Sequence, residues 1–170
     1  IHDVYIGSTA SLSVNKCGDD LYWTLADSTL TITGSGAMYE YANMQMIPWY
    51  NQRNNIAYVS LPDGLTNIAR NAFYNCDALR IVNIPNGVTS IGRDAFYSCD
   101  ELTTVNIPGS VTKIGEWAFA YCDKLTSVNI PDSVTSIGNN AFYSCYNLSD
   151  VTLENGIKYI SSYMFSYCTS

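Results

Sequence analysis

Five cysteines recur at a constant interval of 23 residues, and this interval constrains the fold of the 170-residue chain more than any other feature. A strict interval indicates an internal repeat, in which each copy forms one structural unit and neighbouring units stack. The cysteines of the series are Cys76, Cys99, Cys122, Cys145 and Cys168. Because no insertion interrupts the series, the sequence predicts a solenoid, a regular stack of similar turns of chain.

Each unit carries more apolar positions than a 23-residue segment can bury alone. Five units span residues 56–170 and begin at Ile56, Leu79, Leu102, Leu125 and Leu148. Their shared pattern is L-x-x-V-x-I-P-x-x-V-x-x-I-G-x-x-A-F-x-x-C-x-x, with eight mostly apolar positions. A single unit lacks the partner surface that would bury these side chains, so the units must stack in order to fold.

Two short extended segments are expected in every unit. Residues 82–84 alternate inward and outward, a period of two that is typical of a strand, and a proline then ends the strand because it has no N–H to donate. The second segment, Val88 to Ile91 and its copies, reaches a glycine where we expect a tight turn with no room for a Cβ atom. The Ala-Phe pair of each unit is expected on a short helical or 3₁₀ turn, with the phenylalanine in the core. The glycines are Gly92, Gly115 and Gly138.

The segment before the repeats predicts a β-rich cap over residues 13–55. Residues 21–25 and 30–34 are expected to form a hairpin, joined by residues 26–29, that covers the open end of the stack. Trp49 is expected to pack against the first unit; the alternative is a sugar platform formed by Trp23 and Trp49. Residues 1–12 are predicted to be a linker or lead-in.

The units resemble the treponemal-type leucine-rich repeats of BspA-like bacterial surface proteins over residues 56–170. The preceding runs CGDDLYWTL, LTITGSGAM and PWY are similar to segments that precede such repeats in Firmicute relatives. The resemblance implies a right-handed leucine-rich-repeat solenoid, secretion or surface display, adhesion or ligand binding, and no enzymatic activity. The last unit departs from the pattern at Glu154 and Ser161, which replace the proline and the glycine. We therefore expect a terminal or drifting repeat, and a longer protein with further repeats or domains.

The cysteine spacing also limits the chemistry that is available. Cysteines on neighbouring units have Cβ atoms about 4.8 Å apart, beyond the roughly 3.5–4.5 Å of a disulfide, and the two-to-four-residue spacing of zinc ligands is missing. Buried free thiols are therefore expected, while the partner of Cys17, if it has one, is left open. The only histidine is His2 at the N-terminal end, which removes a Cys–His nucleophile. We predict no catalytic residues, no cofactor and no metal.

Charge and hydropathy exclude two classes of partner. The net charge is −7 and the eight basic residues are scattered, which argues against nucleic acid as a ligand. No apolar run reaches the roughly 18 residues that a membrane span requires, so direct membrane insertion of this segment is not expected.

The outward positions of the first extended segment form the predicted binding face. Its amides stack from unit to unit and either hydrogen-bond to one another or remain free for a ligand. The candidates on this face are Tyr58, Arg80, Asn83, Thr103, Asn106, Thr126, Asn129 and Asp150. Trp117 replaces the Asn or Asp of three other units and is expected at the surface beside Tyr97, Tyr121 and Tyr143, where it is the best single candidate for a stacking contact.

These observations favour a non-enzymatic extracellular module that recognises a protein or a glycan through the lateral faces of the solenoid. The alternative is a structural spacer that displays another domain at the cell surface.

Overall fold

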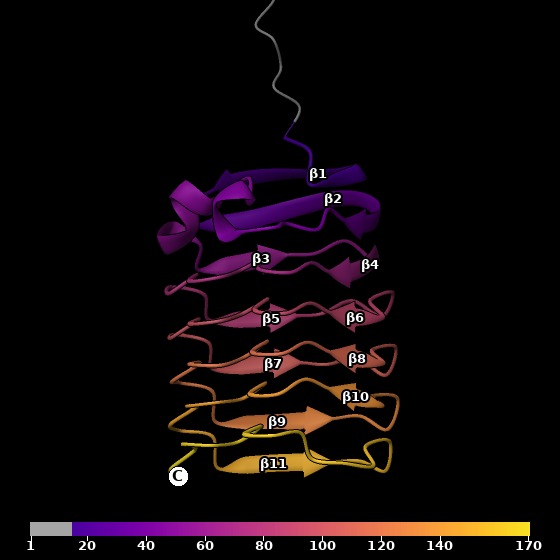
Figure 1. Ribbon diagram of the computed structural model, residues 1–170. Helices are drawn as coiled ribbons and strands as arrows, with labels where there is room; N and C mark the ends of the chain where they lie inside the picture. Colours follow the sequence, from indigo (N-terminus) through magenta and orange to yellow (C-terminus); the bar gives the residue numbers. More distant parts are fainter. Residues whose placement is uncertain (1–14) are drawn as a thin grey trace, which may run out of the picture.

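Each repeat forms one turn of a solenoid with two short parallel strands, and successive turns place these strands in two ladders (Figure 1). The computed structural model describes residues 15–170, so the linker predicted for residues 1–12 lies outside the described residues. The first ladder contains β3 (Tyr58–Ser60), β5 (Ile81–Asn83) and β7 (Thr104–Asn106). The same row continues in β9 (Ser127–Ile130) and β11 (Asp150–Leu153), which pair with each other as a separate two-stranded sheet (Figure 1). The second ladder contains β4 (Gly64–Ile68), β6 (Ser90–Ile91), β8 (Lys113–Ile114) and β10 (Ser136–Ile137).

Strand register follows the 23-residue period. Val82 of β5 lies beside Val105 of β7, and Ile91 of β6 lies beside Ile114 of β8. Val82 and Ile84 are buried while Asn83 between them is exposed, which confirms the predicted alternation. Both ladders therefore turn one apolar row toward a shared core.

The cap is a hairpin whose second strand also serves as the first turn of the solenoid. β1 (Gly18–Ala26) and β2 (Thr29–Met38) are antiparallel and are joined by Asp27 and Ser28, both with positive φ, as in a two-residue hairpin turn. The connection is thus shorter than the four residues that were predicted. The first half of β2 pairs with β3 and its second half pairs with β4. One strand therefore begins both ladders, and β1 covers its outer edge (Figure 1).

Two short 3₁₀ helices, η1 (Met44–Met46) and η2 (Tyr50–Asn55), follow the hairpin and place Trp49 at the top of an aromatic stack. Trp49 is fully buried, its indole N–H donates to the carbonyl oxygen of Ala72 at 2.8 Å, and its ring stacks on Phe73. Trp23 meets Trp49 edge-on. The core interpretation of Trp49 is confirmed, and a sugar platform that needs this ring is wrong.

The stack continues through one phenylalanine per unit, with ring centroids 5.1–5.5 Å apart; its members are Phe73, Phe96, Phe119, Phe142 and Phe165. The turns that carry these rings alternate two kinds of backbone bond. Tyr74 N–H donates to Asn71 within the unit, as in a 3₁₀ turn, whereas Phe73 N–H donates to Ala95 of the next unit. The Ala-Phe segments therefore form a third column of bonds between units.

The glycine after the second strand is needed because it lacks a Cβ atom, as predicted, but the neighbouring unit rather than the turn itself limits the space. The φ angle of Gly115 lies outside the left-handed region, so its turn does not require glycine. A Cβ atom at Gly115 would instead stand 2.5 Å from the backbone nitrogen of Arg93, in the preceding unit. Gly92 and Gly138 approach the preceding unit in the same way. These glycines set how closely neighbouring units stack.

The repeated cysteines are free thiols. They form a column next to the stacked phenylalanines. Cys99 Sγ donates to the carbonyl oxygen of Phe73 at 3.2 Å, and the three later cysteines repeat this bond to Phe96, Phe119 and Phe142. Burial raises the pKa of every thiol in the column, for Cys145 to about 12. The prediction of buried free thiols is confirmed, and Cys17 is likewise buried and free.

We expect the thiols of Cys76, Cys99, Cys122 and Cys145 to resist an aromatic disulfide reagent at pH 8 while the chain is folded. A raised pKa lowers the thiolate fraction at this pH, and burial denies the reagent access. The half-buried Cys168 should react first, and denaturant should expose all six thiols. Rapid modification of Cys99 or Cys122 in the folded chain would contradict the described packing.

The last unit has lost its second strand. β11 pairs with β9, but residues 157–161 form no strand to follow β10. Glu154 stands where earlier units have proline, so its N–H donates to Ile130, and its carboxylate accepts from Asn129 and from the backbone N–H of Asp132. The predicted departure at this unit therefore coincides with a real change in structure.

Candidate recognition surfaces

The strand face consists of the outward side chains of the strands in the first row, and it holds five of the nine predicted site residues: Tyr58, Asn83, Asn106, Asn129 and Asp150. Asn83 lies beside Asn106, and Asn129 lies beside Thr152. Asn83, Asn106 and Asn129 are all exposed. Among the described residues, no hydrogen bond joins these three amides to one another; Asn129 instead donates to Glu154 at 3.2 Å. The amide-to-amide ladder is therefore not formed, and the polar groups of Asn83 and Asn106 face solvent.

The register of the strand face differs from the predicted one at its first and last units. The sequence predicted that all eight candidates, Arg80, Thr103 and Thr126 included, occupy outward positions of the first extended segment. The structure places Tyr58 beside Ile81 and Asp150 beside Ser127, one position further along. Arg80, Thr103 and Thr126 precede their strands and form a separate column, in which the hydroxyl of Thr103 donates to the carbonyl oxygen of Arg80 at 3.1 Å. The prediction was wrong because Ile81, although apolar, is 44% exposed.

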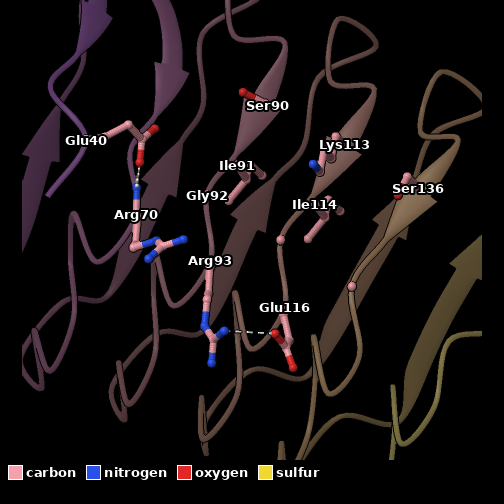
Figure 2. A pocket seen from close by; sticks show the side chains of 12 residues that line it. Glu40, Arg70, Ser90, Ile91, Gly92, Arg93, Lys113, Ile114, Glu116 and Ser136 are labelled. Atoms are coloured by element: carbon pink, nitrogen blue, oxygen red, sulfur yellow. Dashed lines mark hydrogen bonds and ion pairs between the residues drawn. The ribbon is translucent and has the colours of Figure 1, made fainter. Parts of the chain in front are cut away.

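A hollow of about 490 Å³ lies along the second ladder, at the glycine turns (Figure 2). Its charged lining comes from Glu40, Arg70, Arg93, Lys113 and Glu116. Arg93 pairs with Glu116 at 3.1 Å, and Glu40 accepts from the backbone N–H of Arg70 at 3.3 Å (Figure 2). Both cations and anions line this hollow, so it selects no single sign of charge. None of the predicted site residues lines it.

The third surface, the aromatic column, runs along the turns that follow each Phe of the core. Its tyrosines contact one another from unit to unit with ring centroids 4.9–5.6 Å apart; they are Tyr74, Tyr97, Tyr121, Tyr143 and Tyr167. The half-buried Trp117 lies between two of them, 6.3 Å from Tyr97 and 5.2 Å from Tyr143. Two of the three predicted neighbours, Tyr97 and Tyr143, contact Trp117, while Tyr121 lines a hollow beside it; the indole is less exposed than expected.

Trp117 occupies space that a small neighbour leaves open. Units one, two and four read NAFYN, DAFYS and NAFYS across this turn, whereas the third unit reads WAFAY. Ala120 therefore stands where the other three have tyrosine, and it is fully buried. Two rings of the third unit, Trp117 and Tyr121, both lie against Tyr97 and Tyr143 in place of that missing ring. The fifth unit, YMFSY, repeats the arrangement with Tyr163 and the small Ser166.

Trp117 and Tyr121 adopt a left-handed backbone conformation, which is unfavourable for bulky side chains. Trp117 has φ +58° and Tyr121 has φ +60°, where the second and fourth units have Asp, Asn or Ser. Bulky residues are rare in the left-handed region, at a cost of about 1–2 kcal/mol each. Tyr163 and Tyr167 share this strain. The positive φ recurs at these two positions in every unit, so the strain at Trp117 and Tyr121 comes from placing an aromatic residue there.

Two hollows flank Trp117, and the indole lines both of them. The first, of about 420 Å³, is bounded by Met44, Asn71, Tyr74, Arg93, Asp94, Tyr97, Trp117 and Tyr121. The second, of about 370 Å³, is bounded by Trp117, Asn140, Tyr143, Tyr163 and Tyr167. Burial raises the pKa of Tyr97 to about 12, so its hydroxyl stays neutral. Each hollow thus combines aromatic walls with side-chain amide, carboxylate or hydroxyl groups.

Replacing the motif of the third unit by that of the fourth should preserve or raise stability. The triple substitution Trp117→Asn, Ala120→Tyr and Tyr121→Ser writes NAFYS into the third unit and removes both strained aromatic residues. We expect a net gain of about 1 kcal/mol, or about 2–4 °C in Tm, measured by thermal unfolding. A marked fall in Tm would show that Trp117 serves mainly to stabilise the fold.

Tyr74, Tyr163, Tyr167 and Met44 line the hollows but were not singled out from the sequence. Tyr163 and Tyr167 carry a usable signal, since they repeat the positions of Trp117 and Tyr121 two units later. Met44 precedes the repeat and follows no period, so its position depends on η1.

Neither a metal centre nor a membrane span is found in residues 15–170. Histidine, cysteine and carboxylate side chains there do not gather in threes that could hold a metal ion. None of the helices in this range has the length and apolar character of a membrane span.

Comparisons with solved structures find bacterial leucine-rich repeat proteins. A leucine-rich cell surface protein of Faecalibacterium prausnitzii A2-165 is 34% identical with a TM-score of 0.65, and the match covers 88% of this chain and 45% of that one. A leucine-rich repeat protein of T. pallidum is 27% identical with a TM-score of 0.68, covering 88% of this chain and 76% of that one.

A leucine-rich repeat protein of Eubacterium ventriosum is 29% identical with a TM-score of 0.67, covering 82% of this chain and 43% of that one. The chain thus spans less than half the length of the F. prausnitzii and E. ventriosum proteins. No curated protein matches it in sequence. The family model for the BspA type leucine rich repeat region matches residues 47–170 in six copies, beginning within the segment assigned above to the cap. Together with the two strand ladders and the 23-residue period, this match shows that the chain belongs to the BspA-type leucine-rich repeat family.

Proposed function

We propose that this chain is a non-enzymatic recognition module at the bacterial cell surface, and that it binds an extracellular protein or glycan at the aromatic column. The observation that carries the proposal is the pair of hollows on either side of Trp117. The location is supported by the F. prausnitzii structure, which is that of a cell surface protein.

The aromatic column supports binding better than the other two surfaces do. Its rings offer large contact area with little side-chain freedom to lose, and tryptophan and tyrosine are enriched among residues that dominate binding energy. Trp117 and Tyr121 are also kept in an unfavourable backbone conformation. The strand face, by contrast, mixes amide side chains with isolated exposed apolar residues such as Ile81, and its residues line none of the three hollows described above.

The strand face and a purely structural role remain the competing explanations. The strand face would bind through many modest hydrogen bonds from Asn83, Asn106 and their neighbours, which are exposed and not bonded to one another. A spacer would display another domain and bind nothing itself. Each explanation predicts a different response to substitution of Trp117 and Asn106.

The test is binding of the purified chain to a panel of immobilised extracellular-matrix proteins and glycans. Trp117→Asn and Asn106→Ala are measured in parallel, since asparagine already occupies the equivalent of Trp117 with positive φ at Asn71 and Asn140. We expect saturable binding that Trp117→Asn weakens about tenfold or more and Asn106→Ala leaves unchanged. The opposite pattern would move the site to the strand face. If no protein or glycan of the panel shows saturable binding, the result would favour the spacer.

A further inference from the structure

We propose that the two hollows beside Trp117 are adjacent subsites for a neutral, linear oligosaccharide that runs along the solenoid axis and crosses the indole. This inference rests on the recognition function proposed above and names its ligand class. It is carried by three observations: one indole shared by both hollows, compensated charge in their lining, and a backbone whose hydrogen-bonding groups are already used between units.

The aromatic rings supply the stacking surface that a sugar needs. A pyranose ring presents C–H groups on its faces and hydroxyls around its edge, so it packs against an aromatic ring and hydrogen-bonds at its rim. Trp117 and Tyr97 line the first hollow, and Trp117 and Tyr143 line the second. Asp94 lines the first hollow, where its Oδ2 accepts from Arg93, and Asn140 lines the second with an amide that can both donate to and accept from a sugar hydroxyl.

Compensated charge favours a neutral sugar over an acidic one. Arg93 is the basic residue that lines the first hollow, and its guanidinium pairs with Asp94 at 3.1 Å and with Glu116 at 3.1 Å. The second hollow is lined by aromatic side chains and Asn140, with no charged group among the described residues that bound it. The chain as a whole carries a net charge of −7. An acidic sugar would therefore gain little attraction from Arg93, which is already paired, and would be repelled by the net negative charge of the protein.

The backbone along the column is poorly suited to an extended peptide. Peptides that add to a sheet edge need unpaired N–H and C=O groups. Here the turns are bonded between units: Trp117 N–H donates to Asn139, Phe119 N–H to Ala141, and Tyr121 N–H to Tyr143. Ring faces and polar side chains therefore remain as the principal binding groups, and they match a ligand of hydroxyl-rich rings.

The geometry sets a minimum length for the ligand. Tyr97 and Tyr143 belong to units two apart, so about two strand spacings of 4.8 Å separate them. This span exceeds the width of one pyranose ring. A monosaccharide can occupy one hollow, whereas filling both requires at least two linked sugars, and affinity should rise with chain length until both are filled.

The experiment uses a glycan array followed by calorimetry on the purified chain. The array holds neutral oligosaccharides of glucose, xylose, mannose and N-acetylglucosamine from one to six residues long, with oligogalacturonates as acidic counterparts. We expect at least one neutral series to bind, with hexasaccharides about tenfold or more tighter than the monosaccharide. The stable triple variant with NAFYS in the third unit should lose this binding. Tyr163→Asn, which alters only the second hollow, should weaken the hexasaccharide, and Asn106→Ala should change nothing.

Three results would overturn the inference: no neutral glycan binds, binding survives in the triple variant, or the oligogalacturonates bind more tightly than their neutral counterparts. If an extracellular-matrix protein binds through Trp117 while no glycan does, the recognition function stands and the sugar subsites are wrong. If neither class of ligand depends on Trp117, both proposals fail.

Discussion

Ile114→Asp should unfold the solenoid or lower its Tm by at least about 10 °C. Ile114 is fully buried at the centre of the second ladder, between Ile91 and Ile137. The substitution removes apolar burial and places a carboxylate at a fully buried position in the apolar core. Losing the isoleucine alone costs about 2–5 kcal/mol, and the unpaired polar group adds about 1–3 kcal/mol. The sum is comparable with the whole stability of an ordinary domain.

Asn106→Asp is the matched control, because it introduces the same side chain into the same unit at an exposed strand position. Its Tm should stay within about 1–2 °C of the wild type. Thermal unfolding followed by circular dichroism decides the comparison. A normal Tm for Ile114→Asp would mean that the second ladder does not turn this residue inward, and the described register would be wrong.

Gly115→Ala should cost about 3 kcal/mol, although it adds a single methyl group. The new Cβ would stand 2.5 Å from the backbone nitrogen of Arg93 and 2.5 Å from the carbonyl carbon of Gly92. Backbone atoms cannot rotate away as a flexible side chain can, so two neighbouring units must move apart and lose packing along their shared surface. We expect Tm to fall by about 6–12 °C, measured by calorimetry.

Gly109→Ala separates this close approach from the general effect of replacing a glycine. A Cβ at Gly109 meets no atom within 4 Å, and its φ is not left-handed. Alanine there should leave stability unchanged or raise it by about 0.4–1 kcal/mol, because it restricts the unfolded chain. An equal loss of stability in Gly109→Ala and Gly115→Ala would show that the close approach between units is not the reason for glycine at position 115.

The parts of the fold that repeat could be predicted from the sequence. The cysteine interval implied that the units stack in phase. Val82, Asn83 and Ile84 implied a strand with one buried row, because each position recurs in every unit and its polarity can be compared across units. The need for a residue without a Cβ atom at Gly115 was predicted correctly, but the neighbouring unit that takes up this space was not anticipated. A close approach between units is a property of the stack, and the sequence of one unit does not display it.

The parts that do not repeat could not be predicted in the same way. β2 carries neither the cysteine nor the phenylalanine of the pattern, so its double role as the first strand of both ladders was not anticipated. On the strand face, polar residues were assigned to the outward positions, and the exposed Ile81 was missed because it is apolar. Trp117 was recognised because it breaks the pattern of its position, whereas the space left by Ala120 emerged only when neighbouring units were placed together.

The most direct test of recognition at the aromatic column is an NMR titration that follows the indole N–H signals of Trp23, Trp49 and Trp117, assigned with the triple variant. The titrant is the component of the protein and glycan panel that saturates the wild-type chain. We predict that the Trp117 signal shifts in proportion to occupancy while the signal of Trp49, buried in the core, stays fixed. Saturation of the chain with the Trp117 signal unmoved would contradict the proposed site.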